Sequence, residues 1–209
     1  MAERPRHLLV VAGTGTEVGK TWVGAGLATT ARTVGMTVAA RKPVQSFEPG
    51  TGPTDAEVLA AATGERPDDV CPPHRSYERA VAPFMAAARL GRPPFTLAEL
   101  VAELAWPVGV GLGLLEPAGG VRSPMTSDGA DTVDLLEAVR PDAVVLVADA
   151  GLGTINAVRL SLDALAGWPV TVLLNRFDDG KTLHRDNRAW LTVNVDAEVI
   201  VEPTLLLPG

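Results

Sequence analysis

The sequence has little of what marks secreted, membrane-spanning or nucleic-acid-binding proteins. Cys71 is its only cysteine, so it can form neither an intrachain disulfide nor a zinc site built from several thiolates. Its apolar runs fall short of the ~18 residues that a membrane helix needs, and the run over 8–12 is too short for a signal peptide. With a net charge of -7, it lacks the cationic excess of a nucleic-acid surface. We therefore expect a cytoplasmic protein whose partners are small molecules or other proteins.

What the sequence does have is a regular alternation of strand and helix patterns. Short apolar runs recur along the chain, each followed by a glycine-containing loop and then by a segment with helical periodicity. This order predicts an α/β fold with a mostly parallel sheet covered by helices on both faces. Because one domain holds roughly 150 residues, we expect a single domain spanning 1–209. The expected strands cover 8–12, 37–40, 111–115, 143–148, 170–174 and 198–201, and the expected helices cover 19–34, 54–63, 81–90, 97–106, 131–139, 155–166 and 183–191, with an irregular loop over 64–80.

A glycine-rich loop follows the first expected strand. The segment Gly13-Thr-Gly-Thr-Glu-Val-Gly-Lys-Thr21 leads directly into the first expected helix, so backbone N–H groups and the helix dipole point at one place. That arrangement favours a phosphate, with Lys20 serving the β and γ phosphates of a nucleotide and the Thr21 hydroxyl placed to bind magnesium. The alternative is a simple turn with Lys20 in solvent, which leaves unexplained why a lysine and a hydroxyl begin an apolar helix.

Further polar residues stand at or near the carboxyl ends of the other expected strands, where open parallel sheets bind their ligands. Lys42 follows the second strand, which we expect one strand from the phosphate loop, and a second lysine there can neutralise charge that develops at a γ-phosphate. Asp55 begins a helix and Glu116 ends a strand, and both offer the hard oxygen ligands that magnesium prefers. Asn175 follows the strand over 170–174 and can hydrogen-bond a nucleotide base.

Several of these residues also have a purely structural alternative. Asp55 can cap the helix that it begins, and Asn175 can be a turn residue. Asp149, which ends the strand over 143–148, is either another polar residue of the site or a residue that stabilises the glycine turn after it. Cys71 has no catalytic motif around it and is expected to be an ordinary loop or core thiol. The three histidines lack metal-ligand spacing and are expected at the surface or in loops: His7, His74 and His184.

Together these segments resemble the dethiobiotin synthetase family, the ATP-dependent cyclo-ligases of biotin biosynthesis. The resemblance rests on five segments in the family's order: 13–21, Lys42-Pro-Val-Gln-Ser46, Thr54-Asp-Ala56, Glu116-Pro-Ala-Gly-Gly120 and 145–156. It implies a P-loop NTPase fold and an enzyme that uses ATP and Mg²⁺ to join CO2 to 7,8-diaminononanoate, giving dethiobiotin, ADP and phosphate. In that reaction one amine becomes a carbamate, the carbamate oxygen takes the γ-phosphoryl group, and the second amine closes the ring.

The resemblance also implies roles for individual residues and a homodimer that binds the diamine near the subunit interface. Lys42 would be catalytic, stabilising the carbamate and the transferring phosphoryl group. The substrate would contact Thr16, Lys42 and Ser46, and magnesium would be held by Thr21, Asp55 and Glu116. The residues implied to contact ATP are Thr16, Glu17, Val18, Gly19, Lys20, Thr21, Asp55, Glu116, Ala118, Gly119, Asn175, which would face the adenine, and Pro203.

Three positions depart from the family pattern. Gly15 stands where many members have aspartate, Phe47 replaces a glycine, and Pro117 replaces the first glycine of a second loop. Phe47 adds bulk beside the implied substrate site, and Pro117 removes a backbone N–H. A homologue with altered substrate or weakened catalysis is therefore one alternative. Another is a partner-driven regulatory ATPase of the partitioning or metal-insertion type, although such ATPases usually carry an extra lysine early in the phosphate loop, and 13–18 has none.

Overall fold

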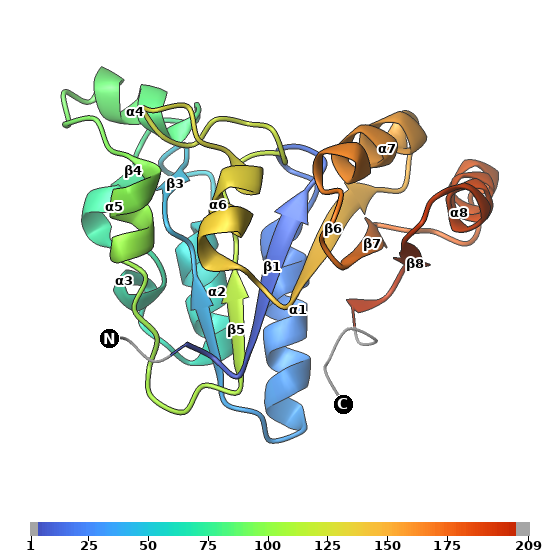
Figure 1. Ribbon diagram of the computed structural model, residues 1–209, viewed down its shortest axis with the longest axis horizontal. Coiled ribbons are helices and arrows are strands. Elements are labelled where there is room, and N and C mark those ends of the chain that lie inside the picture. The colour runs from blue at the N-terminus through green and yellow to red at the C-terminus, as the bar shows by residue number, and fades with distance from the viewer. Residues whose placement is uncertain (1–3, 204–209) are drawn as a thin grey trace.

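The first apolar run forms a central strand of a parallel sheet. In the computed structural model, which describes residues 4–203, β1 (His7–Gly13) pairs with β5 (Leu112–Leu115) on one side and β6 (Ala143–Asp149) on the other. The sheet is completed by β2 (Val38–Arg41), β7 (Val170–Asn175) and β8 (Glu198–Ile200). The strand order is β2-β5-β1-β6-β7-β8, and all neighbours run parallel (Figure 1). Helices on both faces bury β1 completely along most of its length, which explains its continuous apolar sequence.

The expected strands are all present, each ending within a residue of its expected position. Outside this sheet lie the short strands β3 (Gln45–Ser46) and β4 (Ser76–Tyr77). The helices are α1 (Lys20–Thr33), α2 (Asp55–Thr63), α3 (Pro67–Val70), α4 (Pro83–Arg89), α5 (Leu97–Ala102), α6 (Thr132–Val139), α7 (Thr154–Ala164) and α8 (Thr182–Asn194), with a 3-10 turn, η1 (Pro73–Arg75).

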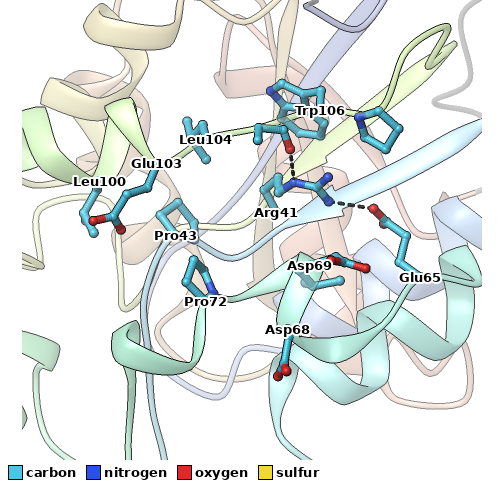
Figure 2. A pocket seen from close by; sticks show the side chains of 13 residues that line it. Arg41, Pro43, Glu65, Asp68, Asp69, Pro72, Leu100, Glu103, Leu104 and Trp106 are labelled. Atoms are coloured by element: carbon cyan, nitrogen blue, oxygen red, sulfur yellow. Dashed lines mark hydrogen bonds and ion pairs between the residues drawn. The ribbon is translucent and has the colours of Figure 1, made fainter. Parts of the chain in front are cut away.

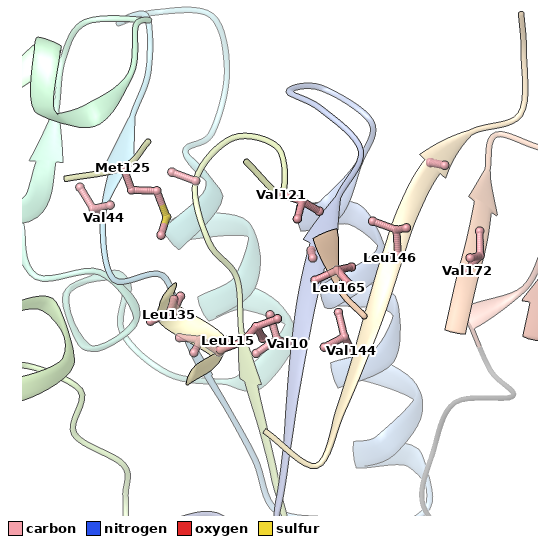
Figure 3. Packing of buried hydrophobic residues seen from close by; sticks show 14 of the residues in the cluster. Val10, Val44, Leu115, Val121, Met125, Leu135, Val144, Leu146, Leu165 and Val172 are labelled. Atoms are coloured by element: carbon pink, nitrogen blue, oxygen red, sulfur yellow. The ribbon is translucent and has the colours of Figure 1, made fainter. Parts of the chain in front are cut away.

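Two hydrophobic clusters, one on each face of the sheet, hold the helices in place. Leu9 and Val11 of β1 point to the face covered by α1 and α2, where Val23, Leu27 and Leu59 are buried. The opposite face carries α6, α7 and α8, and Figure 3 shows Val10 and Leu146 there among residues such as Leu135 and Leu165. Within residues 4–203, none of the helices combines the length and the apolarity needed to cross a bilayer.

Residues 64–80 are more ordered than we expected. They contain α3 and η1, and β4 pairs with β3 in a separate two-stranded parallel sheet, with Gln45 opposite Ser76. The prolines that suggested an irregular loop stand instead at the first positions of the two short helices, Pro67 in α3 and Pro73 in η1. Proline suits that position, because its fixed φ is helical and its missing N–H would have no partner there.

Two further expectations were wrong in detail. The helix expected over 97–106 ends at Ala102, because the following segment turns to meet Arg41, whose guanidinium donates to the Ala105 carbonyl at 2.6 Å and lies over the Trp106 ring. His184 is not at the surface: it is buried near the start of α8, where its Nδ1 accepts a hydrogen bond from the backbone of Asp178 at 3.0 Å.

Candidate functional site

The phosphate loop joins the carboxyl end of β1 to α1, as the sequence predicted. Gly19, with φ of 96°, occupies the position before α1, and no side chain among residues 4–203 caps this helix. The first N–H groups of α1 are therefore left for a ligand, and the positive end of the helix dipole lies beside them. Lys20, the first residue of α1, folds back so that its Nζ donates to the Gly15 carbonyl at 3.1 Å.

A second loop, which follows β5, lies against the phosphate loop. The Val121 N–H donates to the Gly13 carbonyl at 3.1 Å. A Cβ on Gly120 would lie 3.2 Å from Gly15 Cα, so the two backbones touch where the second loop has no side chain. The implied ATP contacts Ala118 and Gly119 therefore lie next to the phosphate loop.

A cluster of charged side chains fills the space beside the start of α1. Lys42 Nζ lies 2.6 Å from Glu116 Oε1 and 2.6 Å from Asp55 Oδ2. The Thr21 hydroxyl lies 2.8 Å from Asp55 Oδ1 and 2.9 Å from Glu116 Oε1. The structure thus brings together the residues predicted for catalysis and for magnesium from β1–α1, β2, β5 and α2. We expected Lys42 one strand from the phosphate loop. In the sheet, β5 lies between β2, which Lys42 follows, and β1, which the phosphate loop follows.

The ionisation of this cluster follows from burial and from the close pairing. Burial raises the pKa of Glu116, and Lys42 opposes that effect only in part. Burial alone would lower the pKa of Lys42, but Glu116 and Asp55 outweigh it and hold that pKa above its ordinary value. Burial likewise opposes the influence of Lys42 on Asp55, whose pKa is nevertheless lowered. Lys42 is therefore a fixed ammonium at neutral pH.

Lys20 has the opposite tendency. Burial, followed by repulsion from Lys42, lowers the pKa of Lys20 to about 8. A buried ammonium whose counter-charges are shared with another lysine is destabilised, and an anion placed beside it would remove that penalty. The surroundings of Lys20 at the start of α1 therefore favour the binding of an anion.

The acidic side chains fit a magnesium ion. Within the part of the chain that the structure describes, Glu116 Oε2 is buried and has no hydrogen-bond partner, which is costly for a carboxylate oxygen unless a cation or donor joins it. No three His, Cys, Asp or Glu side chains of residues 4–203 gather as a metal site. Two carboxylates and the Thr21 hydroxyl suit Mg²⁺, because this ion usually keeps several waters and takes oxygens from a bound phosphate.

Asn175, at the end of β7, faces the phosphate loop. Its Nδ2 donates to the Val18 carbonyl at 2.9 Å, and a Cβ on Gly19 would lie only 2.1 Å from that nitrogen. The adenine contact implied for Asn175 stays a prediction, whereas its amide already anchors the loop. Sequence reasoning missed Arg176, whose Nη2 donates to the Glu17 carbonyl at 3.0 Å. Its place directly after a strand-end residue was the only available signal.

Some residues singled out in the sequence lie outside this cluster. The Ser46 hydroxyl donates to the Val81 carbonyl at 2.6 Å, and Thr16 is exposed in the phosphate loop. Pro203 lies against α1 near Gly26. Asp149 takes the structural role that we had left open, since its Oδ1 accepts a hydrogen bond from the Gly151 N–H at 2.7 Å.

The helix-capping alternative for Asp55 is also resolved in part. Thr54, one residue earlier, is the N-cap of α2, and it forms a reciprocal capping box with Glu57. Because the helix is already capped, the Asp55 carboxylate is free to contact Lys42 and Thr21.

A separate cavity of about 490 Å³ opens beside the end of β2 (Figure 2). Leu100 and Glu103 are among the residues that line it, as are Trp106 and, beneath its ring, Arg41, which pairs with Glu65 at 2.7 Å. None of its lining residues belongs to the phosphate loop, so this cavity is distinct from the nucleotide-binding candidate.

Comparisons with known proteins agree with the geometry. A family model described as an AAA domain matches residues 7–199. The ATP-dependent dethiobiotin synthetase BioD of Rhodococcus jostii (strain RHA1) is 41% identical over 160 residues, which cover 76% of this chain and 68% of that protein. The enzyme of the same name from Caulobacter vibrioides (strain NA1000 / CB15N) is 43% identical over 166 residues, 75% and 73% of the two chains. That from Chromohalobacter salexigens is 38% identical over 206 residues, 90% and 85%.

Solved structures are similar in fold alone. The signal recognition particle receptor FtsY from Elizabethkingia anophelis superposes with a TM-score of 0.58 at 16% identity, over 95% of this chain and 59% of that one. The signal recognition particle 54 kDa protein of Aeropyrum pernix K1, in complex with GDP, gives 0.50 at 18% identity, over 98% and 45%. These neighbours confirm the P-loop NTPase fold, and the sequence relatives confirm the resemblance found in the motifs. The chain belongs to the ATP-dependent dethiobiotin synthetase family.

Proposed function

We propose that the protein joins CO2 to 7,8-diaminononanoate at the expense of ATP and so forms dethiobiotin. The observation that carries the proposal is the position of Lys42, whose ammonium lies 2.6 Å from both Asp55 and Glu116 and beside the start of α1. Phosphoryl transfer to a carbamate needs positive charge held next to the transferring group and little other chemistry from the protein. Lys42 and Lys20, which are close enough to repel each other, would supply that charge.

The chain's own groups account for binding and orientation. The free N–H groups at the start of α1 and the Lys20 ammonium would bind the ATP phosphates, and the glycine-rich second loop lets backbone approach them. Lys42 would neutralise the carbamate oxygens as they approach the γ-phosphate, which removes repulsion between two anions. Thr16 and Ser46 would orient the diamine through their hydroxyl groups. The rate then comes from positioning and charge stabilisation.

Covalent catalysis by the protein is not part of the proposal. Burial raises the pKa of the Cys71 thiol to about 12, so it is neutral at physiological pH and a poor nucleophile. Magnesium, held by Thr21, Asp55 and Glu116, would neutralise phosphate charge. The unpartnered Glu116 Oε2 supports this assignment.

The direct test measures dethiobiotin and ADP formed from the diamine, bicarbonate and MgATP. The wild-type protein should form the two products in equal amounts. Lys42→Met should lower kcat by about 100-fold or more, the usual effect of removing a group that stabilises transition-state charge. Lys181→Met is the matched control, because Lys181 is exposed and its ammonium lies 3.9 Å from Asp178 rather than beside Asp55 and Glu116, and it should leave the rate unchanged. ADP release that ignores the diamine would contradict the proposal.

Two alternatives give different results in the same assay. A partner-driven regulatory ATPase would hydrolyse ATP only with a protein partner and would be indifferent to the diamine. A homologue with weakened ring closure would bind ATP but form little dethiobiotin, and glycine at positions 47 and 117 should then raise its activity. Phe47 is half-buried and its backbone donates to Tyr77, so the glycine variant tests bulk beside the implied substrate site.

We also propose that the protein works as a homodimer in the cytoplasm. Leu152, Leu160 and Val193 are exposed apolar side chains that a subunit interface would cover. The buried free thiol of Cys71 fits a reducing compartment. Light scattering coupled to gel filtration tests the first point, since a dimer has twice the chain's 21.8 kDa.

A further inference from the structure

Two consecutive residues at the end of β7 hold two consecutive carbonyls of the phosphate loop. Asn175 Nδ2 donates to the Val18 carbonyl at 2.9 Å, and Arg176 Nη2 donates to the Glu17 carbonyl at 3.0 Å. The phosphate loop lies after β1, whereas the two donors lie at the end of β7 and directly after it, on the far side of β6. The contact therefore links two strand ends that are not neighbours in the sheet.

These hydrogen bonds fix which way the loop's N–H groups face. Every peptide bond in residues 4–203 is trans, so the C=O and N–H of one peptide plane point in opposite directions. Holding the carbonyls of Glu17 and Val18 toward β7 turns the N–H groups of Val18 and Gly19 away from it. Among the described residues neither of these N–H groups has an acceptor, so both are free to bind an anion.

Two residues of this contact have backbone conformations that are unfavourable in isolation. Glu17 has φ of 61° and Arg176 has φ of 56°, and such values are unfavourable for residues with a Cβ. Strain of this kind persists only where surrounding contacts determine it, and it gathers at binding sites. Asp149 supplies one such contact: its Oδ2 lies 3.5 Å from Arg176 Nη1, while its Oδ1 is fixed by the Gly151 N–H.

We propose that Arg176 and Asn175 are positioning residues that orient the phosphate-loop amides before the nucleotide binds. The pair, named here the carbonyl clamp, acts through the backbone of Glu17 and Val18. It preorganises the N–H groups of Val18 and Gly19 toward the β- and γ-phosphates. That the ligand is ATP rests on the proposed function, whereas the clamp would favour the binding of any polyphosphate.

Binding of inorganic triphosphate tests the clamp without any contribution from a base or from the diamine. Calorimetry on the full chain should show that Arg176→Met raises the Kd for triphosphate by about tenfold, because a hydrogen bond from a charged donor is lost. Arg176→Lys should recover only part of the affinity, since lysine keeps the charge but not the planar fork. The matched control is Arg89→Met, which removes an exposed arginine at the end of α4 and should leave the Kd unchanged.

The variant Asn175→Ala distinguishes a role of Asn175 in the clamp from a contact between Asn175 and adenine. The clamp requires weaker triphosphate binding in this variant, whereas loss of a base contact alone would affect ATP but not triphosphate. The Arg176 variants should keep the wild-type melting temperature within a few degrees, because the Arg176 side chain is 61% exposed and its removal leaves no cavity.

Unchanged triphosphate binding by Asn175→Ala would overturn the clamp, and so would three other results. One is a Kd of Arg176→Met within twofold of wild type. Another is full recovery by Arg176→Lys together with disappearance of the Met defect at high salt, which would reduce Arg176 to a diffuse charge. The third is a wild-type protein that does not bind triphosphate at all. A protein that passes these tests yet makes no dethiobiotin would refute the proposed function and leave the clamp standing.

Discussion

Replacing Gly19 with alanine should lower the free energy of unfolding by about 3 kcal/mol, well beyond the cost of an unfavourable φ alone. Gly19 has φ of 96°, which for alanine costs about 1 kcal/mol. The new Cβ would also lie 2.1 Å from Asn175 Nδ2, so that side chain must move and release the Val18 carbonyl. The lost hydrogen bond and the displaced side chain each add about 1 kcal/mol.

Gly35 provides the matched control for this prediction. Its φ of 83° is similar, but nothing lies within 4 Å of an added Cβ. Gly35→Ala should therefore lower the free energy of unfolding only by the cost of the unfavourable φ, about 1 kcal/mol. Urea unfolding followed by tryptophan fluorescence gives both values. The reasoning fails if the two variants lose the same stability.

A double-mutant cycle tests whether the larger loss of stability in Gly19→Ala comes from the clash with Asn175. In the background Asn175→Ala, the clash partner is gone, so Gly19→Ala should cost about 1 kcal/mol, as it does at Gly35. An unchanged cost of about 3 kcal/mol in that background would place the strain elsewhere in the loop.

Three further predictions concern the rest of the fold. Gly113→Ala would put a Cβ 2.5 Å from Pro5 Cγ and 2.9 Å from Trp106 Cζ3, so it should lower stability by about 2 kcal/mol and shift the tryptophan emission; a neutral effect on the urea midpoint would contradict this packing. Because burial raises the pKa of Cys71 to about 12, iodoacetamide at pH 8 should label the thiol slowly in the native protein and rapidly in urea, and fast native labelling would argue against its burial. Asp131→Ala should cost about 1–2 kcal/mol by thermal unfolding, because its side chain caps α6, and an unchanged melting temperature would show that the cap is dispensable.

The candidate site was largely predictable because one rule of parallel sheets governs it. Lys20, Lys42 and Glu116 follow the ends of three different strands, and the carboxyl ends of parallel strands meet at one edge. The strand pattern and the glycine-rich loops of the sequence therefore predict that these side chains lie close together. The capping box of Thr54 likewise depends on residues three apart, which a sequence displays directly.

The features that could not be predicted from the sequence depend on contacts between segments far apart in the chain. Arg176 resembles any exposed arginine in a turn until β7 is known to end near the phosphate loop. Arg41 is buried only because Glu65 and Trp106 arrive from elsewhere in the chain to surround it, and that contact also ends α5 early. His184 lies on a polar helix, and its burial follows from the turn at Asp178 that packs over it.

The strand order also dictates when the sheet can form during synthesis. Among residues 4–203, β1 pairs only with β5 and β6, and β2 pairs only with β5, so neither early strand has a neighbour until residue 115 leaves the ribosome. At an elongation rate of about 5–20 residues per second, the roughly 100 residues between β1 and β5 take about 5–20 seconds. Throughout that interval the two apolar faces of the nascent β1 have only helices to shield them. The phosphate loop at its end therefore stays without its sheet until β5 has been translated.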